Sequence, residues 1–529
     1  MAQTTQEHHH HPEDLAADVV EDLELERASL HDSIAHDFST SETGIVPLDH
    51  RRPLWHFIGI WTTFAAGFSY LFIGTQIHDA GFSLLGCVGV TLLGAAIYFV
   101  YAIFAAYLGS RTGQTHALLT RSVFGVSGSQ LVSVFLIFGA LGWTGFQAGL
   151  MVQIWNGLYG WSGVEALTIV FAAVMVFNNL FGFTGISVFA RYVVTPLVIL
   201  WVAYMVIKGL SSGSHLGAHP KNVLALNFWQ ITGVIVGSAM WGNEPDIWRY
   251  GKPKFWWPAP AYAFALCGSM LLFAVGGWMM AEFAGSSSFG TVVKYTTHYS
   301  LFGLLPLAFI LATISQFAIN DGNYYEAINA VQNMFGGWRR WKRLYSCLIC
   351  AGISALAGYL VNYAVTDGFE KVAAFLAISV PCATVIMCVD HFVFPRLYGI
   401  SRSLDKVPSW GQTAFANWPA IVALAITVAF GAYATGIMPG ENANRYWGPA
   451  TLIAWTMAGL LYVAFVGLTR AAVPRVQALK HALGFSKLVI DAPYPSAAVI
   501  DMATLSESRA GAATGGTAPA LAGSFVDAS

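Results

Sequence analysis

The sequence predicts an all-α integral membrane protein, and three observations support this. Of the 529 residues, 56% are hydrophobic and only 10% are charged, whereas soluble domains carry about 25% charged residues. The apolar residues form stretches long enough to cross a bilayer, which takes about twenty residues per crossing. The basic residues are divided very unevenly between the two ends of these stretches. A soluble domain is therefore excluded.

In chain order, the apolar stretches predict twelve transmembrane helices within a transporter domain over 51–470. Residues 1–50 are polar and acidic, and residues 471–529 are polar and rich in Ala, Gly and Thr, so we expect both tails to be largely disordered. The expected spans are 55–77, 83–108, 129–158, 165–184, 189–209, 228–248, 260–283, 302–333, 344–364, 370–390, 418–438 and 447–468.

The basic residues orient these spans. Alternating the sides from the N-terminus places 19 Lys and Arg on the N-terminal side and 5 on the other, and the two left in the tails complete the total of 26. Because cytoplasmic loops carry the excess of Lys and Arg, both termini are expected in the cytoplasm of a multi-pass protein of the cell membrane.

Several classes of function lack their signals. The net charge of −2 gives no basic surface for nucleic acid. Cys347 and Cys350 have no second pair and no nearby His, so they do not indicate a metal site. The spans contain neither a His/Glu metal cluster nor a nucleophile with its base, so nothing indicates an enzyme. The tails show no signal for a protein partner.

The sixth span contains a predicted break. Gly242 and Pro245 bracket Asn243 and Glu244, and proline interrupts a helix because it lacks a donor and clashes with the preceding turn. Irregular backbone at membrane depth is tolerated where it lines a cavity or binds something. The alternative is a helix that simply ends at Gly242 among the lipid headgroups.

The first span carries the small residues Ala65, Ala66 and Gly67 next to Ser69, where the helix can loosen. Spans one and six are thus interrupted at corresponding places, five spans apart. This spacing predicts two inverted five-helix repeats with a binding site between them.

Two further spans carry candidate binding residues. Trp143 and Gln147 are four residues apart in span three and share one helix face, which suits a flat, hydrogen-bonding ligand; the alternative is packing among glycines. Span eight contains a dense run of polar residues, and polar residues inside a membrane are costly and usually functional. They are Ser315, Gln316, Asn320, Asp321 and Asn323. The alternative there is that Asn320 and Asp321 cap a short helix at the boundary.

These stretches together resemble the nucleobase:cation symporter-1 family, nearest its cytosine permease branch, from about Arg51 to Arg470. The matching motifs are Thr63-Phe-Ala-Ala-Gly-Phe-Ser, the loop Arg121-Ser-Val-Phe-Gly-Val, Gly142-Trp-Thr-Gly-Phe-Gln, Pro245-Asp-Ile-Trp-Arg-Tyr-Gly and Ile319-Asn-Asp-Gly-Asn-Tyr-Tyr. The resemblance implies a LeuT-like fold of ten core helices plus two extra helices. It also implies cation-driven uptake of a planar heterocycle such as cytosine or a purine.

The resemblance also implies roles for residues. Trp143 and Trp241 would stack on the ring, while Gln147 and Asn320 would hydrogen-bond its edge. Phe68 and Ser69 would complete the substrate site. A cation would lie among Ala65, Phe68 and Ser315.

The resemblance leaves the coupling ion open between Na⁺ and H⁺, with no other cofactor or metal expected. The family's cytosine permeases carry two hydroxyl residues just before the span-eight Asn, where this chain has Ala318 and Ile319. Losing two oxygens weakens the case for sodium, a hard cation that prefers oxygen ligands. Asp321 or Glu244 could carry a proton instead. Alternatives for the function are transport of a hydantoin, allantoin or a thiamine-precursor pyrimidine, or an uncoupled facilitator.

Overall fold

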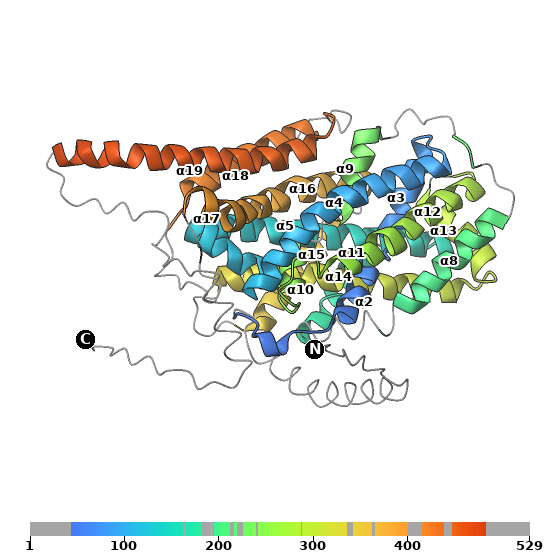
Figure 1. Ribbon diagram of the computed structural model, residues 1–529. Coiled ribbons are helices and arrows are strands. Elements are labelled where there is room, and N and C mark those ends of the chain that lie inside the picture. Colours follow the sequence, from blue (N-terminus) through green and yellow to red (C-terminus); the bar gives the residue numbers. More distant parts are fainter. Residues whose placement is uncertain are drawn as a thin grey trace, which may run out of the picture.

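The computed structural model describes residues 44–482 except for 162–164, 182–191, 193–194, 212–215, 219–225, 240–241, 287, 336–341, 362–364, 400–401, 403–414 and 438–446. Every regular element in this part of the chain is a helix (Figure 1). Most of the two predicted tails lies outside the described residues. At the inner edges of these tails, residues 48–50 form a 3₁₀ turn and the last helix continues to Ala482.

The helices follow one another in the order η1 (Leu48–His50), α2 (Leu54–Phe64), α3 (Phe68–Asp79), α4 (Leu84–Thr112), α5 (His116–Tyr159), α6 (Glu165–Val174), η2 (Phe177–Phe181), α8 (Thr195–Ser211), α9 (Phe228–Ala239), α10 (Glu244–Trp248), α11 (Ala259–Ala263), η4 (Phe264–Met270), α12 (Leu271–Ala284), α13 (Phe289–Ser300), α14 (Leu305–Phe335), α15 (Arg343–Val361), α16 (Val365–Cys388), η5 (Val389–Val393), α17 (Phe394–Leu397), α18 (Trp418–Ala434) and α19 (Ala450–Ala482). Elements η4 and η5 are π-helical.

Long apolar helices dominate, as the sequence predicts. Within the described residues, seven helices are long and apolar enough to cross a membrane, and the bent pair α2–α3 makes an eighth. Each of the twelve expected ranges overlaps a helix, although several of these helices are too short to count as spans by themselves. Helix α13, between the seventh and eighth ranges, was not predicted.

The predicted interruption of the first span is confirmed. Helix α2 ends at Phe64, Gly67 is extended at φ −94° and ψ 149°, and α3 starts at Phe68. The two helices differ in direction by 48°. The small residues at 65–67 therefore end one helix and allow the next to begin at a new angle.

The predicted break in the sixth span is confirmed too. Helix α9 ends at Ala239, Gly242 has φ +70°, and the short α10 begins at Glu244 with Pro245 in its first turn. Glycine adopts this left-handed conformation without the steric cost that a side chain adds. Residues 243–248 are all buried in protein, so the alternative of a helix ending among lipid headgroups is wrong.

Helix α5 starts earlier than the sequence predicts. It begins at His116 and runs through 121–126, which we expected to be a loop, with a kink at Gly125 where φ is +77°. The sequence analysis started this span at residue 129, after the glycine, because a single sequence does not show that the chain keeps helical geometry on both sides of one kinked residue.

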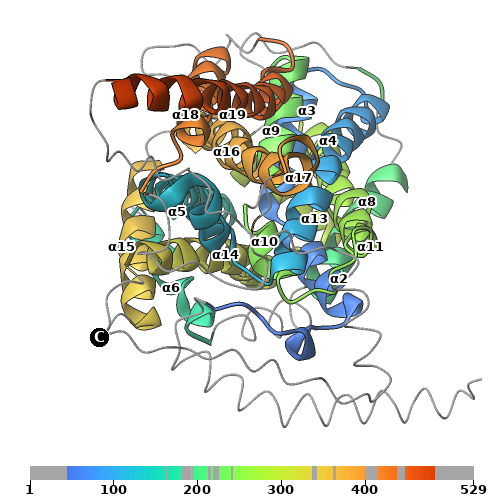
Figure 2. The same cartoon turned by 60° about the vertical axis from the view of Figure 1, so that its left-hand side comes forward.

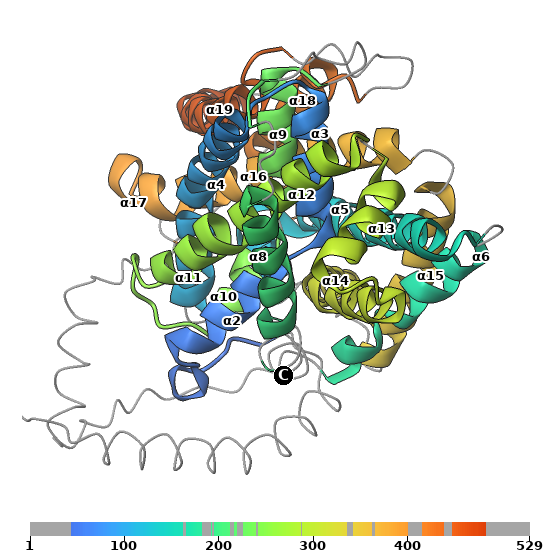
Figure 3. The ribbon, with the colours of Figure 1, turned by 90° about the vertical axis from the view of Figure 1, so that its right-hand side faces the viewer.

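The last two long helices flank the rest of the bundle. Helices α18 and α19 pack against each other and against α16, and they lie together on one flank in all three ribbon views (Figures 1, 2 and 3). This arrangement suits the two helices that the sequence predicts to be additional to the repeats.

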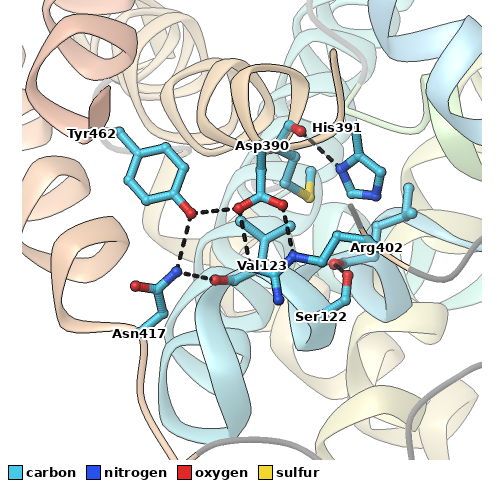
Figure 4. Close-up of polar contacts among 9 residues, drawn as sticks. Ser122, Val123, Asp390, His391, Arg402, Asn417 and Tyr462 are labelled. Carbon is cyan, nitrogen blue, oxygen red and sulfur yellow. Dashed lines mark hydrogen bonds and ion pairs between the residues drawn. The ribbon is translucent and has the colours of Figure 1, made fainter. Parts of the chain in front are cut away.

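A buried polar cluster connects this flank to α5 (Figure 4). Arg402 donates from Nε and Nη2 to the two carboxylate oxygens of Asp390 at 2.7 and 3.0 Å. Tyr462 donates to the same carboxylate at 2.5 Å, and Asn417 donates to the carbonyl of Val123 at 2.6 Å. Four separate segments thus converge next to the kink at Gly125.

Helices α3 and α12 approach each other at backbone distance. A Cβ atom added to Gly277 would lie 1.9 Å from the Leu71 carbonyl oxygen, and one added to Gly74 would lie 2.1 Å from that of Ala274. Only glycine fits at two such positions, because the neighbouring atoms belong to backbone. Small residues allow this kind of close packing between membrane helices.

Candidate ligand and cation site

The interruption in span one lies directly against α14. Ser315 Oγ donates to the carbonyl oxygen of Ala66 at 3.2 Å, and both residues are fully buried. A Cβ atom added to Gly67 would lie 2.7 Å from Cδ1 of Ile319. The structure therefore brings together the two segments that were predicted to hold a cation, Ala65–Phe68 and Ser315. Cation binding at this place stays a prediction.

Gln147 reaches the same region from α5. Its Nε2 donates to Ser69 Oγ at 3.3 Å, in the first turn of α3. Its Oε1 is buried and has no hydrogen-bond partner within the described part of the chain. Because a buried polar atom without a partner costs about 1–3 kcal/mol, this oxygen is available for a ligand that can donate a hydrogen bond.

Trp143 begins a chain of aromatic rings around this end of α3. Its ring centroid lies 5.2 Å from that of Phe146, and Phe146 lies 6.1 Å from Phe72. Phe68 packs instead on Trp201 of α8 at 5.3 Å. The sequence analysis selected Trp143 and Phe68 but missed Phe72 and Phe146. Phe72 lies four residues after Phe68, and this spacing on one helix face could have indicated it.

Span eight offers a second amide that the sequence analysis did not select. Gln316 is fully buried, and no described residue forms a hydrogen bond with either of its side-chain polar atoms. It belongs to the polar run that the sequence shows in span eight, although the sequence analysis gave it no role in binding. An amide that donates and accepts at once suits the edge of a heterocycle.

Asn320 is in the middle of α14, which runs on to Phe335, so the alternative of a boundary cap is wrong. Its Nδ2 donates to the Gln316 carbonyl at 2.8 Å and lies 3.1 Å from Met175 Sδ, while its Oδ1 accepts from Asn323 at 3.0 Å. Its polar atoms thus have protein partners in this conformation, unlike those of Gln316. Contact of Asn320 with a ring requires that it exchange these partners.

The two predicted proton carriers lie in different surroundings, and Trp241 lies outside the described residues. Asp321 is fully buried, and its carbonyl oxygen accepts from Asn179 at 3.1 Å. Glu244 is fully buried at the start of α10, and its Oε1 accepts from Tyr98 at 2.7 Å. Within the part of the chain that the structure describes, no three His, Cys, Asp or Glu side chains are placed to hold a metal ion together.

Comparison with known proteins identifies the family. The sequence profile described as "permease for cytosine/purines, uracil, thiamine, allantoin" matches residues 49–457. The chain belongs to this permease family. The family predicted from the sequence motifs is thereby confirmed.

Curated relatives from bacteria and fungi are similar to this family member. The cytosine permease of Escherichia coli K12 is 25% identical over 392 residues, which cover 72% of this chain and 83% of the relative. The purine-cytosine permease fcyB of Emericella nidulans is 23% identical over 410 residues, covering 71% of this chain and 75% of the relative.

Solved structures share the fold. Mhp1, a nucleobase-cation-symport-1 family transporter in a closed conformation with bromovinylhydantoin bound, matches with a TM-score of 0.66, 17% identity, and coverage of 82% of this chain and 96% of Mhp1. A Na⁺-coupled sialic acid symporter matches with a TM-score of 0.56 and 9% identity, covering 84% of this chain and 97% of the symporter. At such low identity the likeness concerns the fold alone.

Proposed function

We propose that this protein is a secondary active transporter that takes up cytosine, a purine or a related planar heterocycle by cation-coupled alternating access. The observation that carries the proposal is the position of Gln147. Its unpartnered oxygen lies beside Ser69, at the interruption of span one that Ser315 contacts from α14. An amide, a chain of aromatic rings and an interrupted helix thus meet in one buried place, which is how secondary transporters build their sites.

The proposed architecture has twelve spans, two inverted five-helix repeats and both termini in the cytoplasm. Two sets of contacts support this orientation. Arg51 Nη1 donates to the carbonyls of Ser110 and Gly251, and Arg52 N donates to the carbonyl of Tyr250, at 2.7–3.0 Å. The start of the first range therefore lies beside the ends of the second and sixth ranges, on one side of the bundle, as spans that alternate in direction require.

A second set of contacts agrees with the first. Arg121 Nε, at the start of α5, donates to Asn333 Oδ1 near the end of α14 at 2.5 Å. The start of the third range thus lies beside the end of the eighth, again on the N-terminal side.

Uptake into proteoliposomes tests the function. The purified protein is reconstituted, sodium and proton gradients are imposed separately, and the panel contains radiolabelled cytosine, adenine, uracil, allantoin and hydantoin. We expect at least one ring to accumulate above its outside concentration under one of the gradients. Equilibration without accumulation would indicate a facilitator, and no uptake of any ring under either gradient would overturn the proposal.

A further inference from the structure

Three carboxylates are buried on the N-terminal side of the candidate site. Glu244 and Asp246 belong to α10, and Glu326 belongs to α14; each is at most 1% exposed. Glu326 is eleven residues beyond Ser315, which places it about 16 Å further along the helix axis. The cluster therefore lies between the candidate site and the proposed cytoplasmic surface.

These carboxylates differ in how well their oxygens are hydrogen-bonded. Asp246 accepts from the His116 amide at 3.0 Å and from Asn329 Nδ2 at 2.6 Å. Glu244 accepts from Tyr98 through Oε1 at 2.7 Å, and backbone hydrogen bonds from Gly242 and from Glu244 itself also act on its carboxylate. Neither oxygen of Glu326 has a hydrogen-bond partner among the residues that the structure describes.

The carboxyl group of Glu326 is directed at the break in span six. A Cβ atom added to Gly242 would lie 2.2 Å from Glu326 Oε1. Next to it, Asn243 is fully buried with both side-chain polar atoms unpartnered. The break thus presents an unused donor and acceptor beside an unused carboxyl group, which indicates that a small polar species belongs here.

The charges around Glu326 favour a proton over a metal ion. Asp246 and Glu244 both act on Glu326 electrostatically, and neither Glu244 nor Glu326 takes part in an ion pair among the described residues. In the described part of the chain, other titratable groups near this pair include Tyr98 and Tyr101 on α4 and Tyr262 on α11. The His116 ring bonds to the Gly242 carbonyl at 2.8 Å, and the Arg249 guanidinium donates to Tyr325, next to Glu326 in sequence, at 2.9 Å. Removing a carboxylate from water without a cationic partner costs several kcal/mol, which a bound proton avoids.

We propose that Glu326, with Glu244 beside it, is a proton-binding site that couples separation of α10 from α14 to substrate transport. In the closed arrangement the pair is dry and holds a proton. When α10 moves away from α14, water reaches the carboxyl group and the proton leaves it for the cytoplasm. A proton gradient thereby biases the equilibrium between the two arrangements, because the proton binds one of them more tightly. This inference rests on the proposed function and names its coupling ion.

Proton uptake on ligand binding is the direct test. Cytosine and adenine are added to the purified full-length protein in weakly buffered detergent solution with a pH indicator, and their affinities are measured between pH 5.5 and 9. We expect the wild-type protein to take up protons on binding. Its affinity should fall at alkaline pH, at most tenfold per pH unit, because the linkage between proton and ligand is reciprocal.

Glu326→Gln locates the effect, because the amide is neutral and nearly isosteric. The variant should bind with the affinity that the wild-type protein shows at acidic pH, but independently of pH and without proton uptake. In proteoliposomes it should exchange labelled for unlabelled ring while a pH gradient drives no accumulation. Glu282→Gln is the matched control, because Glu282 pairs with His78 at 3.0 Å in another part of the structure; it should keep the wild-type response.

The outcomes separate this inference from the proposed function. Two results would overturn the inference and leave the proposed function standing. One is accumulation by the wild-type protein that is driven by sodium without proton uptake. The other is a Glu326→Gln variant that still accumulates cytosine under a pH gradient. If no ring of the panel binds or enters vesicles, both are overturned. If Glu326→Gln is not monodisperse, Glu326→Met replaces it, and the absence of proton uptake by the wild-type protein is alone sufficient to refute the inference.

Discussion

Replacement of Gln147 by methionine should weaken ligand binding without weakening the ligand-free protein. In the ligand-free structure the side chain makes one long hydrogen bond, 3.3 Å to Ser69, and leaves Oε1 buried without a partner. A net hydrogen bond contributes about 1 kcal/mol, and an unsatisfied buried group costs about 1–3 kcal/mol. The two effects offset each other, so the stability of Gln147→Met should be unchanged or higher by up to about 2 kcal/mol.

The bound state should show the opposite effect. Methionine leaves the polar edge of a ring unpaired, which costs about 1–3 kcal/mol and corresponds to a Kd raised about 5- to 150-fold. Thermal unfolding in detergent gives the stability, and a radioligand binding isotherm with cytosine or adenine gives the Kd.

Gln230→Met is the matched control. Gln230 Oε1 accepts from the amide of Asn227 at 2.9 Å at the start of α9, and losing such a cap costs about 1 kcal/mol. This variant should therefore lose stability and keep its affinity. If Gln147→Met binds as tightly as the wild-type protein, or loses stability as Gln230→Met does, Gln147 is a structural residue and the reasoning fails.

Other substitutions test the packing and the rest of the site. Gly277→Ala should lower the free energy of unfolding by about 1–3 kcal/mol, because the backbone of α3 leaves no room for a Cβ atom. Gly268 has open space around it. Gly268→Ala should therefore leave the free energy of unfolding unchanged in the same thermal unfolding experiment. Arg402→Gln should cost about 3–5 kcal/mol by leaving the buried Asp390 unpaired, and Asp390→Asn in the same chain should recover part of that loss. Trp143→Ala should abolish saturable binding while the protein still inserts into membranes; unchanged affinity would remove Trp143 from the site.

Much of the fold could be predicted because lipid imposes simple rules on sequence. Apolar length marks the helices, and Gly242 with Pro245 marks the break because both residues act on the backbone through local sterics. The kink at Gly125 escaped prediction for a related reason: one glycine with positive φ ends a helix in one context and only bends it in another. Its outcome depends on contacts with distant segments such as 415–417.

The candidate site was predictable only in part. Ser315, Ser69 and Gln147 lie close together, as the family resemblance implied, and each stands at a feature that the sequence shows: a polar run, a helix break or a helix face. Asn320 does not present free polar atoms, because its amide bonds to Gln316 of its own helix, one turn earlier. Sequence shows that two amides lie on one helix, but only the structure shows which of them is left without partners.

The π-helix η4 has a consequence for how the first span can move. Helix α2 packs on α11 and η4, whereas α3 packs on α12. The two halves of the interrupted span therefore contact successive parts of one continuous helical segment, α11–η4–α12. The irregular turn of that neighbour, residues 264–270, is part of the surface that contacts α2 and ends where α12, which contacts α3, begins. The interrupted span α2–α3 and its neighbour α11–η4–α12 can therefore bend together at the same level, each at its own irregular segment. The glycine contacts between α3 and α12 can persist through such a movement, since neither helix has to slide along the other.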